Sequence, residues 1–202
     1  MKKSLLMLFV ICICSCSNAT NKTTNKENGD IGTIKLNAPN LDRSETVMQA
    51  LAKRKSTKES SDKELSLQDL SDLVWAANGI NRPESGKRTA PSAMNKQDVK
   101  VYVCTKDASY LYNAQAQSLE LISSGDARPT PSPVVLVLVT DTNDTWAALD
   151  AGIVSQNISI FCAGAELADY PRGSMNKEAL TKALKLTGTQ TLMLCHPIGY
   201  FK

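Results

Sequence analysis

The chain has 202 residues, of which 42% are hydrophobic, so it is long enough for one domain with a sizeable core. Its formal net charge is +3, and removing residues 1–15, which hold two lysines and no acidic residue, leaves 21 basic and 20 acidic residues. This balance provides no basic face for nucleic acid and no acidic tail. Composition therefore argues against a nucleic-acid-binding protein and does not demand a charged partner.

The N-terminus has the layout of an export signal. Two lysines precede an apolar run over residues 5–13, which is too short to cross a bilayer as a helix but is typical of a secretory signal. The next residues, Ile13-Cys14-Ser15-Cys16, resemble a bacterial lipobox. The resemblance implies cleavage before Cys16 and a lipid on its sulfur, which would anchor the chain in the cell envelope, facing the periplasm or the exterior. An ordinary signal peptide cut at another bond is the alternative.

Residues 16–40 are rich in Asn, Thr, Lys and Ser and show no apolar period. Such a segment buries too little apolar surface to fold, so we predict a flexible stalk. The predicted organisation is a signal peptide over residues 1–15, this stalk, and a folded domain over residues 41–202.

The predicted domain contains both helices and strands. Apolar spacing and capping residues predict helices over residues 44–54, 66–78, 146–167 and 176–186. Alternating or continuous apolar runs predict strands over residues 99–104, 110–112, 119–122, 133–140 and 190–195. The last strand should stop at Pro197, and a long polar loop should cover residues 81–97. This succession predicts an α+β fold.

The cysteines do not form the pattern of a disulfide framework. Three of the six lie in the N-terminal segment, and Cys104, Cys162 and Cys195 each lie in an apolar run. We predict that these three are buried, unpaired thiols, with one bridged pair as the alternative. His196 is the sole histidine, so neither a zinc site nor a Ser-His-Asp triad is expected.

Three polar clusters are candidates for a binding site. Arg54 and Lys58 flank hydroxyl side chains in a pattern suited to phosphate, although a basic helix end has the same composition. Residues 88–95, RTAPSAMN, could present hydroxyl, amide and backbone N–H groups to a planar ligand, or form an ordinary surface loop. Gln156-Asn157 interrupts an apolar helix, where Gln156 could also simply face solvent.

Together these clusters resemble the nitroreductase family over about residues 43–202, and in particular its branch similar to thiazole/oxazoline-forming dehydrogenases. Arg54, Ser56 and Lys58 match an R-x-S-x-R motif with lysine in the last place. The remaining matches are the helical segment SLQDLSDLVWAANGINR, the RTAPSAMN loop, a D-x-G…Q-N pattern over residues 150–157, and a P-x-G-Y ending over residues 197–200. A G-L-G turn common in the family lacks its second glycine in the stretch 164–169.

The resemblance implies an α+β, nitroreductase-like mixed sheet flanked by helices, and FMN as the cofactor. By position, Arg54, Ser56 and Lys58 would hold the phosphate and ribityl chain, with Lys202 as a weaker phosphate candidate. Gln156 would be a further flavin contact. The isoalloxazine ring would be bordered by Pro91, Ser92, Ala93 and Asn95. Family members are usually homodimers with FMN at the interface, which is expected here as well.

The expected function is that of an FMN-dependent oxidoreductase acting on a small conjugated organic substrate outside the cytoplasm. The electron donor would be NAD(P)H or another reductant. The alternatives are a non-enzymatic flavin-binding or carrier lipoprotein with a degenerate site, and a purely structural envelope lipoprotein.

Overall fold

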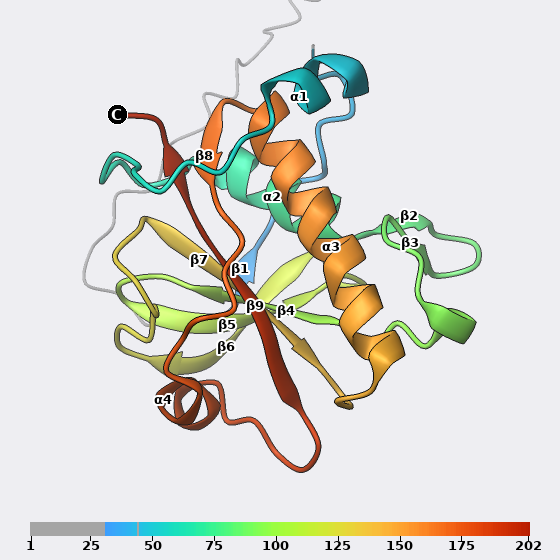
Figure 1. Cartoon of the computed structure of the whole chain (residues 1–202), viewed down its shortest axis with the longest axis vertical. Coiled ribbons are helices and arrows are strands. Elements are labelled where there is room, and N and C mark those ends of the chain that lie inside the picture. Colours follow the sequence, from blue (N-terminus) through green and yellow to red (C-terminus); the bar gives the residue numbers. More distant parts are fainter. Residues whose placement is uncertain (1–30, 44) are drawn as a thin grey trace, which may run out of the picture. The chain divides into compact units, whose positions relative to one another are not determined.

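A seven-stranded sheet is the centre of the structure. The computed structural model describes residues 31–43 and 45–202. Every pairing between neighbouring strands of this sheet is antiparallel, where the family resemblance implied a mixed sheet. In spatial order (Figure 1) the strands are β1 (Ile34–Lys35), β6 (Ser118–Ser124), β5 (Ala108–Asn113), β4 (Lys100–Cys104), β7 (Val134–Thr140), β9 (Thr191–Tyr200) and β8 (Leu167–Asp169).

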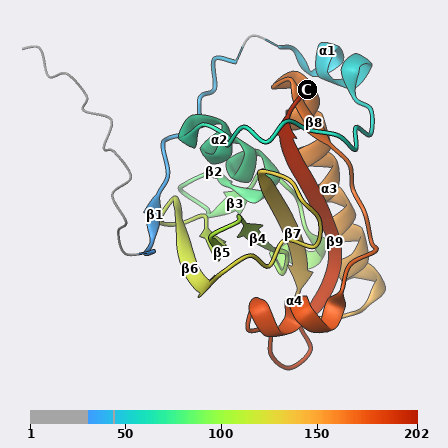
Figure 2. The same ribbon diagram turned by 90° about the vertical axis from the view of Figure 1, so that its left-hand side faces the viewer.

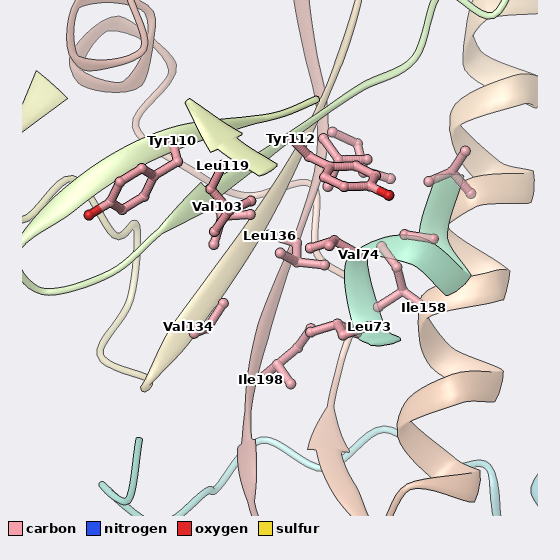
Figure 3. Packing of buried hydrophobic residues seen from close by; sticks show 14 of the residues in the cluster. Leu73, Val74, Val103, Tyr110, Tyr112, Leu119, Val134, Leu136, Ile158 and Ile198 are labelled. Atoms are coloured by element: carbon pink, nitrogen blue, oxygen red, sulfur yellow. The ribbon is translucent and has the colours of Figure 1, made fainter. Parts of the chain in front are cut away.

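Helices cover both faces of the sheet, which confirms the predicted α+β class. Helices α2 (Leu67–Asn78) and α3 (Thr145–Gly164) pack on one face, where they form the main core with side chains of β4, β5, β7 and β9 (Figure 3). Helix α4 (Lys177–Ala183) covers a smaller cluster on the opposite face (Figure 2). Helix α1 (Val47–Lys53) packs against α3. Strand β7 is buried along its whole length, as its continuous apolar sequence predicted.

Capping side chains set where the helices begin. Ser66 accepts a hydrogen bond from the backbone N–H of Asp69 at the start of α2, which begins within one residue of the predicted position. Helix α1 begins at Val47, later than predicted, because Thr46 is its capping residue. Helix α3 ends at Gly164 rather than residue 167, since Glu166 has a left-handed φ of 57° that a helix cannot contain.

The predicted loop over residues 81–97 is partly ordered into regular structure. It contains strands of a small hairpin, β2 (Ile80–Arg82) with β3 (Lys87–Arg88), and a single 3₁₀ turn over Ala93–Asn95. Strands β2 and β3 are too short and too polar to show an apolar period in the sequence, so they were not predicted.

Strand β9 continues to Tyr200, so the predicted stop at Pro197 is wrong. Cys195 exchanges both backbone hydrogen bonds with Arg172 on the outer side of β9. Alternate residues of a strand turn their N–H groups to the same side, so the missing donor of Pro197 also faces outward. Pairing with β8 resumes only at Ile198, so that donor is not required for the ladder.

The prediction of a flexible stalk is wrong from residue 31 onward. Strand β1 pairs with β6 through Ile34–Leu119 and Lys35–Ser118 (Figure 2), and Leu36 is only 4% exposed. Local composition could not reveal this contact, because its partner lies more than 80 residues away in the sequence. The predicted signal peptide, the lipidation site Cys16 and the stalk up to residue 30 lie outside the described residues.

The three cysteines of the domain are buried and free, which confirms the first of the two predictions for them. Burial raises the pKa of both Cys104 and Cys195 to about 11, so these thiols are poor nucleophiles. Among residues 31–43 and 45–202, no helix has both the length and the hydrophobicity needed to traverse a bilayer.

If residues 31–40 belong to the fold, Leu36→Ala should lower the free energy of unfolding by about 2–4 kcal/mol, because it leaves a cavity in the core. Chemical denaturation measures this change. Leu41→Ala is the matched control: Leu41 is 73% exposed, and its replacement should stay within about 0.5 kcal/mol of the parent. Equal stability of both variants would instead favour a stalk that extends to residue 40.

Candidate functional site

The RTAPSAMN loop is attached to helix α3. Both carboxylate oxygens of Asp150 accept the backbone N–H of Ala93 at 3.0 Å, and the Ser92 hydroxyl accepts the N–H of Gln97 at 2.9 Å. Three residues without a glycine's freedom, Met94, Asn95 and Gln97, have left-handed φ values of 53°, 54° and 52°. Such backbone is held only where surrounding contacts fix it, which is common at binding sites.

Arg88 and Gln97 provide that fixation. The Arg88 guanidinium donates to the Gln97 side chain at 3.0 Å and to the last carbonyl of α2, that of Asn78, at 2.8 Å. Gln97 in turn donates to the side-chain oxygen of Asn95 at 3.2 Å. This contact orients the Asn95 side chain through its oxygen and leaves its amide nitrogen able to donate a hydrogen bond to a ligand. Pro91 and Asn95 are both exposed. The individual roles of Arg88, Gln97 and Asp150 were not predicted from the sequence.

A buried carboxyl lies at the end of the same loop. Asp98 is 8% exposed, and its Oδ1 atom has no hydrogen-bond partner among the described residues. Burial raises the pKa of Asp98, and the negative charge of Asp150 adds to the shift.

The predicted phosphate residues lie on a segment, residues 54–61, that crosses strands β8 and β9; we call it the basic segment. The N–H of Thr57 donates to the carbonyl of Asp169, and the N–H of Ser61 donates to the carbonyl of Tyr200, each at 2.8 Å. Arg54, Ser56 and Lys58 are exposed. Within the part of the chain that the structure describes, Arg54 and Lys58 have no ion-pair partner.

The glycine of the P-x-G-Y ending allows this crossing. A Cβ atom at Gly199 would lie 2.8 Å from Ser60 and 2.9 Å from Pro133. The hydroxyl of Tyr200 accepts the N–H of Ser66 and donates to the carboxylate of Asp69 at 2.7 Å, which joins β9 to the start of α2. Lys202, the weaker phosphate candidate, pairs with Glu59 of the basic segment at 3.1 Å. The ending thus positions the basic segment.

Gln156 projects from an exposed face of α3. Trp146, Leu149 and Ile153 precede it at helical spacing and are also exposed, the first two by more than half of their surface. Helix α1 likewise exposes Val47, Met48 and Leu51 and buries only Ala50. Two helices therefore present apolar side chains beside predicted cofactor residues.

A single chain does not bring the predicted residues together. Asp150, which holds the RTAPSAMN loop, and Gly164, which lies next to Ala50 of α1, are separated by about 20 Å of helix. A cavity of about 350 Å³ lies between Arg43, Glu45 and the end of α3. A second one, of about 360 Å³, lies beside the β2–β3 hairpin, where Arg88 and Gln97 line it. None of the predicted cofactor residues lines either cavity.

The sole histidine takes part in a buried polar network. His196 Nδ1 lies 2.8 Å from Asp169 Oδ1, and Nε2 lies 2.9 Å from the Ser155 hydroxyl. The expectation that no Ser-His-Asp arrangement exists is wrong, because α3, β8 and β9 bring together residues that are distant in sequence. Ser155 is nonetheless buried on a helix, so the arrangement does not present a nucleophile to solvent.

Comparisons with known proteins identify the family of this chain. The sequence model of the nitroreductase family matches residues 51–200. The chain belongs to the nitroreductase family. A structure described as a nitroreductase from Ralstonia eutropha has 31% sequence identity and a TM-score of 0.80, and the match covers 84% of this chain and 90% of that one. No curated protein has a detectably similar sequence.

Other members of the fold are more distant. A chain of the Escherichia coli microcin synthetase McbBCD complex with truncated pro-MccB17 bound has a TM-score of 0.65 at 17% identity, with 74% of this chain and 70% of that chain covered. A structure described as an NADH dehydrogenase/NAD(P)H nitroreductase from Parabacteroides distasonis has a TM-score of 0.55 at 16% identity, with 77% and 86% covered. At these identities the likeness establishes the fold alone.

Gly199→Ala should destabilise the protein by about 1–3 kcal/mol, because the new methyl group overlaps the basic segment and Pro133. Thermal unfolding measures the effect. Gly173→Ala is a suitable control, since a Cβ atom there would meet nothing within 4 Å. A Gly199→Ala protein as stable as the control would show that the crossing is looser than described.

Proposed function

We propose that this nitroreductase family member binds FMN and acts as an oxidoreductase on a small conjugated organic substrate. The observation that carries the proposal is the pair of exposed cations on the basic segment, Arg54 and Lys58, which flank the Ser56 hydroxyl and have no ion-pair partner among the described residues. Two such cations and a hydroxyl are the donor set that a phosphate monoester requires.

The RTAPSAMN loop fits the other end of the cofactor. Pro91 and Ala93 offer apolar surface, and the Ser92 hydroxyl keeps its proton free to donate because its oxygen accepts from Gln97. The Asn95 amide nitrogen is a second oriented donor. When bound, FMN would supply the hydride chemistry, while Arg54, Ser56, Lys58, Ser92, Asn95 and Gln156 would orient it.

The active form would be a homodimer. The phosphate and ring candidates lie near opposite ends of α3, and the α3 face that ends at Gln156 exposes Trp146, Leu149 and Ile153. Solvent-exposed apolar residues arranged in one stripe are typical of an interface. A second copy placed on this face would bury the stripe and could complete each site with residues of both chains.

The cellular context is also part of the proposal. The lipobox-like sequence before Cys16 supports a lipid anchor in the cell envelope, and the motif order supports membership in the branch similar to thiazole/oxazoline-forming dehydrogenases. NAD(P)H or another reductant would serve as the electron donor.

The purified full-length chain should show an oxidised-flavin spectrum, and denaturation should release FMN. Arg54→Ala should weaken FMN binding by about tenfold or more, because one charge-assisted contact to phosphate is lost, and leave riboflavin binding unchanged. Titration of flavin fluorescence measures both affinities. Lys55→Ala is the control, because it removes the same charge from a neighbouring position that we do not assign to the site. A colourless protein that refuses added FMN would exclude the proposed activity.

Leu149→Asp should convert a dimer into a monomer in sedimentation equilibrium and should weaken FMN binding, because a charge cannot be buried unpaired at the interface. Leu41→Asp places the same charge at another exposed leucine and should change neither property. Should the parent protein be monomeric and still bind FMN, the two-chain site would be wrong.

A further inference from the structure

Asp169 connects the buried histidine network to the basic segment. Its side chain accepts hydrogen bonds from His196 at 2.8 Å and from the Ser159 hydroxyl at 2.7 Å, one on each carboxylate oxygen. Its main-chain carbonyl accepts the N–H of Thr57, in the middle of the basic segment. One residue therefore faces the protein interior with its side chain and the predicted phosphate residues with its backbone.

The protons of the network follow from what each partner offers. A carboxylate only accepts, so Nδ1 of His196 carries the proton that Asp169 receives. The other ring nitrogen, Nε2, then accepts the hydroxyl proton of Ser155. Each polar atom in the chain from Ser155 to Asp169 has a partner, as a buried network requires.

Burial makes this network rigid. His196 is completely buried, and Asp169, Ser155 and Ser159 are all less than 8% exposed. Removing one donor would leave a carboxylate oxygen of Asp169 without a hydrogen bond in the interior. The free-energy cost of that unpaired oxygen is large enough for Asp169 to move toward another partner. Because Asp169 ends strand β8, such a movement would reach its carbonyl and hence Thr57.

We propose that His196 is a positioning residue for phosphate recognition: through Asp169 it fixes the Thr57 amide, and thereby the spacing of Arg54, Ser56 and Lys58. The proposal rests on the proposed function for its ligand. It assigns no proton transfer to His196, which lies too deep to touch a ligand.

Two replacements of His196 test its two hydrogen bonds, to Asp169 and to Ser155, one at a time. His196→Asn keeps a donor at the position of Nδ1, facing Asp169, and gives up the contact with Ser155. His196→Gln keeps a polar atom at the position of Nε2, facing Ser155, and gives up the donor to Asp169. Both remove the ring, so they share its packing loss.

The first readout needs no cofactor. In hydrogen–deuterium exchange of the full-length chain, the Thr57 amide should exchange about tenfold faster in His196→Gln than in His196→Asn, which should resemble the parent protein. The second readout compares ligands: His196→Gln should weaken FMN binding about tenfold and leave riboflavin binding unchanged, since only FMN has the phosphate.

Two serine replacements repeat the test with smaller changes, in case the histidine variants do not fold. Ser159→Ala removes a hydrogen bond to Asp169, whereas Ser155→Ala removes one to the far side of His196. Both serines are buried on α3, one turn apart. Ser159→Ala should accelerate exchange at Thr57 and lower FMN affinity, and Ser155→Ala should do neither.

The outcomes are separable. Equal exchange at Thr57 in both members of each pair would overturn the proposal, and so would an equal loss of FMN and riboflavin binding. If the parent protein binds no flavin, the proposed function fails, while the exchange measurement still decides whether His196 positions the basic segment.

Discussion

The packing of α3 against the sheet is the constraint on which the rest of the structure depends. Its buried side, which includes Ile158 and Val154, closes the main core together with α2 and β9 (Figure 3). Residues along the same helix also hold the neighbouring loop, the buried histidine network and helix α1. Asp150 holds the RTAPSAMN loop, Ser155 and Ser159 join the network of His196, and Gly164 allows α1 to approach. A shift of α3 would therefore disturb both ends of the proposed flavin site.

Local sequence predicted those features that are encoded locally. The continuous apolar run of β7, the helical spacing of α2 and the apolar residues of β5 and β6 are all local signals, and all four elements are present. Strand β1 and the end of β9 were predicted wrongly because their structure depends on strands far away in the sequence. The apolar side chains of α1 formed the expected helix, but its composition did not reveal that they would stay exposed.

The same distinction applies to the site. Motifs named the residues that could touch a flavin, since these lie in short recognisable stretches such as RTAPSAMN. Arg88 and Asp150 also lie in matched motifs, but the motifs did not reveal that these side chains hold the loop, because each does so through a contact across the fold. Asp169 belongs to no matched motif. The Ser155–His196–Asp169 network was missed for this reason: its members come from three elements and meet only when α3, β8 and β9 pack together.

The location of β1 has a mechanical consequence. The described chain enters the fold at one edge of the sheet, beside β6, and the basic segment crosses the opposite edge at β8 and β9 (Figure 2). Six strand spacings, about 29 Å along the sheet, separate the two edges. Tension applied through the N-terminal end would first be resisted by the two residue pairs of β1 and β6. That edge could peel away under load while the opposite edge, with the predicted phosphate residues, kept its shape.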